Sequence, residues 1–211
     1  MDNRGYGAGL LNDGWQFVKL PFGSGKEELA GAEWQAVDLP HDWLIWQAED
    51  LYETAEVWYR RELTGEEADA PTVMLRFDGV YMDCDVLLNG EVICSHAYGY
   101  TAFDADMSGR MRAGANEILV HIRHRSPNTR WYSGSGIFRD VHLVRLPKEH
   151  IVQDGLYIHS EKVDSGDGSS SDGAWRMTVS AETRGQGSFD CILTDAGGRE
   201  IARGTAEAEP A

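Results

Sequence analysis

The segment 83–94 reads Asp-Cys-Asp-Val-Leu-Leu-Asn-Gly-Glu-Val-Ile-Cys, and it indicates the fold class of the whole chain. Apolar and polar residues alternate along it, so Cys84, Val86 and Leu88 share one face of an extended strand. Asn89-Gly90 follows at once, and this pair suits a type I′ turn because both central positions need positive φ. The segment therefore predicts a β-hairpin.

The same alternation continues on both sides of this hairpin. Residues 72–78 place Val73, Leu75 and Phe77 on one face, and residues 117–123 repeat the pattern. Further strands are expected over 137–146, 151–159, 175–183, 188–194 and 200–205. Short strands separated by turn signals, with no convincing long helix, predict an all-β antiparallel sandwich.

Charge and apolar runs exclude two classes of partner. The 211 residues include 35 acidic and 19 basic side chains, which gives a formal charge of −16. Such a surface repels phosphate backbones, so no nucleic-acid partner is predicted. No apolar run approaches the roughly 20 residues of a membrane span, and residues 1–5 lack a signal-peptide core. We therefore expect no membrane partner and a cytoplasmic location.

The three cysteines do not predict a metal site or a disulfide framework. Cys84, Cys94 and Cys191 are odd in number and irregular in spacing. The first two lie in apolar runs, where a free cysteine packs as a small hydrophobic residue. No cofactor and no metal are predicted from the sequence.

A second domain is expected after Pro147, where the composition changes. Residues 164–173 are rich in Gly, Ser and Asp and predict a flexible loop or hairpin tip. About four strands are expected over 151–205, whereas an immunoglobulin-like sandwich needs about seven. We therefore expect residues 148–211 to form an incomplete immunoglobulin-like β-sandwich domain, with the chain stopping inside it.

Seven segments, in order, resemble motifs of the family 2 glycoside hydrolases, which include β-galactosidases and β-glucuronidases. They are residues 11–17, 34–43, 58–61, 77–90, 99–104, 114–118 and 130–139. The last reads Arg-Trp-Tyr-Ser-Gly-Ser-Gly-Ile-Phe-Arg and matches the family motif almost letter for letter. Single pieces are weak signals, but seven in the right order over 11–146 make the resemblance specific.

The resemblance implies a jelly-roll, sugar-binding-like domain over residues 1–147. It also implies a parent enzyme that cleaves glycosides with retention, using two carboxylates about 5–5.5 Å apart. In the family these are glutamates of a (β/α)₈ barrel that follows the second domain. We expect this chain to lack that barrel, so no residue here is predicted to be catalytic and the chain alone is predicted to be inactive. The form of the 130–139 motif most resembles β-galactosidases.

The loop 123–136 is the first candidate sugar-binding segment, since structureless loops of this length are often functional. Trp131 and Tyr132 offer flat apolar faces for sugar rings, and Arg130 offers fixed hydrogen-bond donors. The alternative is packing against the catalytic barrel, because aromatic residues and Arg are equally typical of interfaces. In some β-galactosidases an acidic residue just before this Trp contacts the substrate, and here 128–130 reads Asn-Thr-Arg.

The acidic segment 49–56 is the second candidate. Its carboxylates are Glu49, Asp50, Glu53 and Glu56, and they could bind a cation or sugar hydroxyls. The alternative is a solvated acidic loop. Glu56 is the residue of this segment that we assign to substrate binding.

His41-Asp42 is adjacent in sequence but is interpreted as a structural turn. Neighbouring residues of an extended chain point in opposite directions, so they form a poor catalytic dyad. Trp15, Trp34, Trp43 and Trp58 are expected in core or interdomain packing.

The leading interpretation is an accessory domain pair that supports the barrel of a β-galactosidase-like parent and shapes the rim of its sugar pocket. Its partners would be carbohydrate and that barrel. The alternative is a free-standing carbohydrate-binding module, which would bind sugars through exposed aromatic side chains. An incomplete sandwich leaves strand edges and apolar faces open, so self-association through residues 151–205, or disorder there, is also expected.

Overall fold

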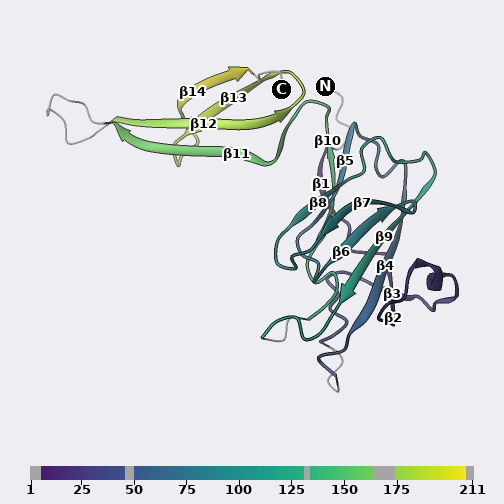
Figure 1. The fold of residues 1–211 in the computed structure, drawn as a ribbon. Helices are drawn as coiled ribbons and strands as arrows, with labels where there is room; N and C mark the ends of the chain where they lie inside the picture. The colour runs from purple at the N-terminus through teal and green to yellow at the C-terminus, as the bar shows by residue number, and fades with distance from the viewer. Residues whose placement is uncertain (1–5, 46–49, 131–133, 164–173, 208–211) are drawn as a thin grey trace. The chain divides into compact units, whose positions relative to one another are not determined.

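β-Strands form nearly every regular element of the computed structural model (Figure 1). The structure describes residues 6–45, 50–130, 134–163 and 174–207. The chain divides into two compact units, Met1–Leu146 (unit 1) and Pro147–Ala211 (unit 2). The prediction of an all-β fold is confirmed. The helical segment η1 (Lys26–Gly31) is too short to cross a lipid bilayer, and the described residues contain no longer helix.

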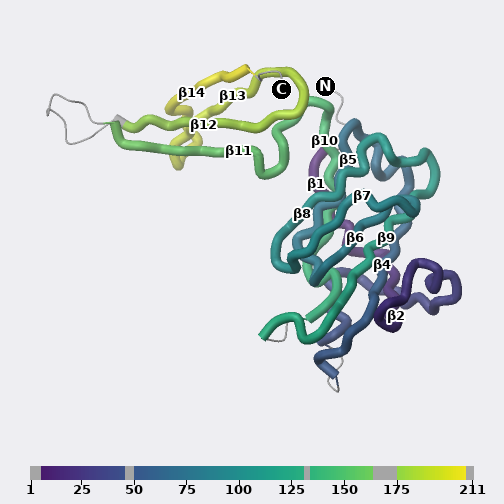
Figure 2. Tube along the Cα trace, viewed as in Figure 1, coloured from purple at the N-terminus to yellow at the C-terminus, as the bar shows by residue number. Residues whose placement is uncertain are grey.

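Unit 1 contains two antiparallel sheets. The four-stranded sheet has the order β1 (Gly7–Leu10), β10 (Val141–Leu146), β5 (Thr72–Phe77) and β8 (Phe103–Asp106). The six-stranded sheet has the order β3 (Gln35–Val37), β2 (Trp15–Pro21), β4 (Ala55–Thr64), β9 (Ala115–His124), β6 (Cys84–Leu88) and β7 (Glu91–His96). Figure 2 shows β1, in purple, beside β10, in green, although these strands are far apart in sequence.

The β6–β7 hairpin has the turn that its sequence predicts. Asn89 has a φ of 51° and Gly90 a φ of 90°, as a type I′ turn requires. Cys84, Val86 and Leu88 are buried on one face of β6, as the alternation indicates. The hairpin forms because its turn and its apolar pattern favour the same register.

The main core lies between the two sheets. Its largest fully buried side chains include Trp15, Tyr59, Phe77, Leu75 and Ile118. Burial of a side chain of this size stabilises the fold by roughly 1.5–3 kcal/mol. The core therefore holds the strands in place and leaves the connections between them to carry the exposed groups.

A smaller apolar cluster covers the outer face of the six-stranded sheet. Val18, Trp58, Leu87 and Leu119 are buried there. Leu29 of η1 and Trp34 pack over them, and the Arg60 guanidinium lies 4.2 Å from the centre of the Trp34 ring. The predicted packing role of Trp15, Trp43 and Trp58 is confirmed, whereas Trp34 is only half-buried.

The strand expected over 137–146 is shorter in the structure, because β10 begins at Val141. Residues 134–137 pair instead with the 41–43 connection: the carbonyl of Ile137 accepts from the N–H of His41 and that of Ser135 from the N–H of Trp43. Gly134 and Gly136 have φ values of 73° and 131°, which disfavour a regular strand.

Unit 2 consists of two hairpins. One is formed by β11 (His150–Val163) and β12 (Ala174–Arg184), the other by β13 (Ser188–Thr194) and β14 (Glu200–Glu207). The predicted strands are present, and no described residue of unit 2 is buried. Isolated two-stranded hairpins are marginally stable in water. The unit therefore lacks a core of its own within the described residues.

Candidate functional site

The described parts of four connections of unit 1 meet at one end of the sandwich: 38–45 with 50–54, 78–83, 97–102, and 125–130 with 134–140 (the loop end; Figure 1). Hydrogen bonds link each to another. The N–H of Asp83 donates to the carbonyl of Ala97 (3.2 Å), that of Ser126 to Oγ1 of Thr54 (3.0 Å), and Tyr81 forms a β-bridge with Gly136. The loop end is the part of the described chain where chemically active groups converge.

Asp42 organises the loop end as a turn residue. Its Oδ1 accepts from the N–H groups of Leu44 (3.0 Å), Ile45 (3.2 Å) and Ser135 (3.0 Å). His41 instead hydrogen-bonds through Nδ1 to the Tyr59 hydroxyl at 2.8 Å. His41 and Asp42 thus have separate partners, as the structural interpretation of this pair predicts.

Burial controls the protonation of this region. Desolvation lowers the pKa of His41, with the Asp42 carboxylate opposing it, and desolvation raises the pKa of the Tyr59 hydroxyl. Tyr59 is fully buried beneath Gly136, where an added Cβ would collide with the Tyr59 hydroxyl and the His41 carbonyl. The His41 imidazole and the Tyr59 hydroxyl are neutral at pH 7 and serve to hold the loops.

Two buried side chains at the loop end have polar atoms without hydrogen-bond partners among the described residues. They are Nε1 of Trp43 and both ring nitrogens of His124. The rings meet edge to face with centroids 5.8 Å apart, and His124 is 2% exposed. Desolvation lowers the pKa of His124. Sequence reasoning missed this pair, because nothing local predicts that β9 ends inside the core.

Glu56 does not belong to a solvated acidic loop. It lies on β4, is 4% exposed, and its Oε2 is 2.7 Å from Nε2 of His121. The His121 ring stacks on Trp58 at 3.9 Å between centroids. Burial lowers the pKa of His121, and the Glu56 carboxylate opposes that effect. The contacts of Glu56 are those of a structural residue, and its assignment to substrate binding stays a prediction.

The other described carboxylates of the 49–56 segment do not gather around one point. Glu53 pairs with Lys19 at 2.8 Å, and Asp50 accepts from the N–H of Tyr52. Because Glu56 faces His121, these groups have different partners. The segment does not form a shared cation site in the described residues.

Arg130 is exposed at the loop end. Trp131 and Tyr132 lie outside the described residues, so the structure does not place them. Nearby, the Tyr81 hydroxyl donates to Oδ1 of Asn128 at 3.0 Å. Arg123, at the start of this loop, donates to Asp83 and Asp85, and its hydrogen bond to Asp83 lowers the pKa of that carboxyl. The loop is thus held at its base, and the assignment of Arg130, Trp131 and Tyr132 stays a prediction.

Sequence reasoning missed a patch of exposed aromatic rings at the loop end. Tyr98 and Tyr100 are 60% and 45% exposed, and their centroids are 5.7 Å apart. Phe138 lies 6.3 Å from Tyr100, and Arg139 covers the Phe138 ring at 5.2 Å. Tyr100 lies within the 99–104 motif and Tyr98 lies just before it. This motif was the only local sequence signal for the patch.

A shallow hollow of about 440 Å³ adjoins this patch. Phe138, Pro40 and Ala102 line its apolar part, and Asp78, Asp140 and Arg139 line its polar part. Asp78 and Asp140 also form a cluster with His142. Within the described residues, this is the group whose geometry suits a metal ion.

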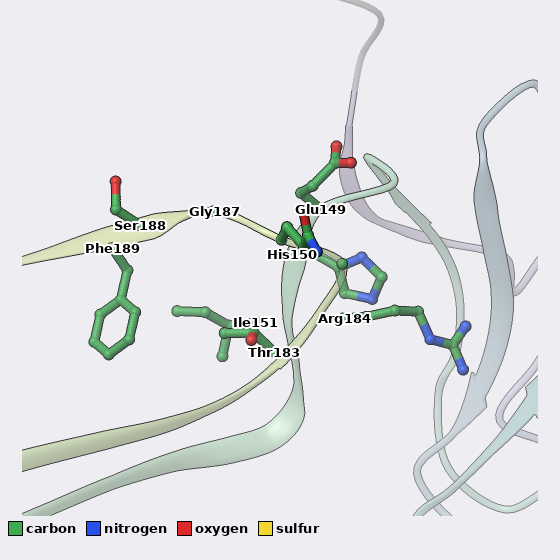
Figure 3. A pocket seen from close by; sticks show the side chains of 10 residues that line it. Glu149, His150, Ile151, Thr183, Arg184, Gly187, Ser188 and Phe189 are labelled. Atoms are coloured by element: carbon green, nitrogen blue, oxygen red, sulfur yellow. The ribbon is translucent and has the colours of Figure 1, made fainter. Parts of the chain in front are cut away.

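Unit 2 has two hollows of its own. One, of about 120 Å³, lies where the two hairpins are joined, and Figure 3 shows Ile151 and Phe189 there, with Arg184 pointing away from them. The other, of about 360 Å³, is lined by apolar residues of three strands. They are Trp175, Met177 and Val179 of β12, Phe189, Cys191 and Leu193 of β13, and Ala202 and Ala206 of β14. Most residues that line the first hollow are polar or glycine, whereas the second is a mainly apolar surface between strands.

The sequence profile of the sugar-binding domain of the glycosyl hydrolases family 2 matches residues 36–147, more than half of the chain. The chain belongs to glycosyl hydrolase family 2. The matched residues contain the whole loop end and most of the core strands. The family expected from the seven motifs is confirmed.

Relatives and solved structures of family 2 agree with this assignment. The chain is 32% identical to the Beta-galactosidase BoGH2A of Bacteroides ovatus over 94% of its own length and 24% of that protein. A beta-glycosidase from Bacteroides vulgatus superimposes with a TM-score of 0.74 at 23% identity, over 96% of this chain and 28% of that chain.

Beta-glucuronidase 3 of Bacteroides uniformis also has a TM-score of 0.74, at 22% identity over 96% of this chain and 29% of that chain. The chain thus spans a quarter to a third of the length of these relatives. At such identities the solved structures establish the fold alone.

Proposed function

We propose that this chain is a non-catalytic N-terminal part of a retaining β-galactosidase of family 2. The observation that carries the proposal is the 32% identity to BoGH2A, named a beta-galactosidase, across 94% of this chain. The match to the family's sugar-binding domain supports a carbohydrate as the ligand of the parent. The substrate would be a terminal β-linked galactose.

In this proposal the loop end contacts the catalytic domain and the rim of its sugar pocket. It presents Arg130, Tyr98 and Tyr100 to solvent beside the half-buried Phe138 ring and a hollow of about 440 Å³. Aromatic residues and Arg are the residue types enriched at interfaces. A buried apolar core lies between the sheets beneath, so these groups would be held in position for a partner domain.

The fold by itself does not select galactose. Beta-glucuronidase 3 of Bacteroides uniformis shares it with a TM-score of 0.74. The choice of galactose rests on the form of the 130–139 motif and on sequence similarity to BoGH2A.

Two measurements test the proposal. The 211-residue chain alone should not turn over nitrophenyl β-galactoside, and robust turnover would refute its non-catalytic role. A chimera in which this chain replaces the matching residues of BoGH2A should fold and hydrolyse nitrophenyl β-galactoside. A folded chimera without this activity would refute the supporting role, and Arg130→Ala in this chimera should lower kcat/KM.

The exposed aromatic patch favours a second candidate, a free-standing carbohydrate-binding module. Rings at 45% and 60% exposure are suited to stacking on sugars without a barrel. A titration of the chain with millimolar galactose, lactose and glucuronic acid, followed by NMR chemical shifts, separates the candidates. Shifts abolished by Tyr100→Ala but kept in Tyr157→Ala, an equally polar control on unit 2, would favour the module. No shifts would favour the accessory domain.

A further inference from the structure

The ends of β5 and β10 bring together three potential metal ligands. Asp78 follows β5 directly, Asp140 precedes β10, and His142 is the second residue of β10. One ligand atom from each lies within 4.8 Å of the others. The backbone fixes this arrangement, because the N–H of Asp78 donates to the carbonyl of Asp140 at 3.0 Å.

The spacing of the ligand atoms of Asp78 and His142 suits one ion. Nε2 of His142 is 3.1 Å from Oδ2 of Asp78. Two atoms at this separation can each lie about 2.1 Å from a zinc ion, with an angle between them of roughly 95°. That angle lies near the values of octahedral and tetrahedral coordination, so an ion could replace the hydrogen bond without moving either strand.

Asp140 can supply the third ligand. Its Oδ1 accepts from Nδ2 of Asn12 at 2.9 Å, which holds the carboxylate in place. A carboxylate has two oxygens, so this contact leaves Oδ2 for an ion. One carboxylate oxygen of the half-buried Asp140 lies within 4.8 Å of the ligand atoms of Asp78 and His142.

Arg76 and His142 meet different oxygens of the Asp78 carboxylate, and the Arg139 guanidinium donates to the Asp78 backbone carbonyl. The Arg76 guanidinium lies 3.8 Å from Oδ1 of Asp78 and also pairs with Asp104 at 3.3 Å. His142 meets the opposite oxygen, Oδ2. The hollow of about 440 Å³ opens onto both Asp78 and Asp140 and gives room for water or a ligand oxygen to complete the coordination.

We propose that Asp78, Asp140 and His142 bind a divalent first-row transition ion of the Zn²⁺ type. One imidazole nitrogen and two carboxylate oxygens form a mixed set that suits Zn²⁺ or Mn²⁺, whereas Ca²⁺ takes six to eight oxygen ligands and Mg²⁺ prefers oxygens and water. The ion would join β5 to β10 and fix the Phe138–Arg139 segment beside the hollow.

Isothermal titration of the untagged 211-residue chain with Zn²⁺ tests the site. We expect one saturable ion per chain, with weaker binding of Ca²⁺ and Mg²⁺. His142→Gln and Asp140→Asn should each weaken zinc binding at least tenfold, since each removes a ligand. Asp140→Asn keeps an oxygen that can accept from Asn12, so one variant preserves the local fold even if the other does not.

His96→Gln is the matched control. His96 lies on β7 of the same unit, and its Nε2 contacts Oγ1 of Thr101 at 3.0 Å. This variant should bind zinc as the unmodified chain does. Zinc should raise its Tm by as much as it raises the Tm of the unmodified chain. Absence of saturable zinc binding, unchanged binding in both folded ligand variants, or a preference for Ca²⁺ over Zn²⁺ would each overturn the proposal.

Discussion

Asn116→Ala should destabilise unit 1 far more than the loss of an ordinary polar side chain. Asn116 is fully buried, and its amide makes four hydrogen bonds. Nδ2 donates to the carbonyls of Arg112 (2.9 Å) and Gly114 (3.0 Å). Oδ1 accepts from the N–H of Arg112 (2.8 Å) and from Nδ2 of Asn89 (2.9 Å). The side chain thus joins the turn before β9 to the β6–β7 hairpin.

The size of the effect follows from these contacts. Each hydrogen bond contributes about 1 kcal/mol net, so loss of all four costs about 4 kcal/mol. Arg112 and Gly114 lie at the surface, where water can replace part of this loss. We expect the free energy of unfolding to fall by about 2–4 kcal/mol. For a unit of this size, 3 kcal/mol corresponds to a Tm decrease of roughly 6–12 °C.

Urea unfolding followed by tryptophan fluorescence measures this change, because Trp15 and Trp58 are buried in unit 1. Asn12→Ala is the matched control: Asn12 makes two such bonds, to Asp140 and to the N–H of Val141. The free energy of unfolding of the Asn12→Ala control should fall by about 2 kcal/mol. A loss below about 1 kcal/mol for Asn116→Ala, or one smaller than the control's, would refute the hydrogen-bond reasoning.

Two other predictions concern acid stability and association. Burial lowers the pKa of His41, His121 and His124 in the folded state. As the pH falls through about 6.5, the ordinary histidine pKa, the unfolded chain therefore binds more protons than the folded chain. The free energy of unfolding should therefore fall between pH 7.5 and 5.5, by at most about 4 kcal/mol for three histidines; equal stability at both pH values in urea titrations would contradict this. Unit 2 has no buried residue among those described and exposes Trp175 at 68%, so we expect self-association through its apolar hollow. Light scattering should show a mass above the monomer that falls with Trp175→Ser but not with Tyr157→Ser, and a monomer at high concentration would count against it.

The sequence by itself determined the strand content, the β6–β7 hairpin and the family. These features depend on local properties: the alternation along 72–78 and 117–123, the positive φ that Asn89-Gly90 accept, and motifs in a fixed order. Such signals are present within a few residues of the chain. They need no knowledge of which strands pair.

The tertiary structure alone decided which side chains meet. Glu56 looked like part of an acidic loop, but β4 pairs with β9 and places it against His121, 65 residues away. Asp78 and His142 lie 64 residues apart, and Asn12 and Asp140 lie 128 apart. Burial and hydrogen bonding depend on strand order and register, which are set by packing of the whole core. A local pattern cannot specify them, so the contacts that give the loop end its chemistry emerge only in the folded chain.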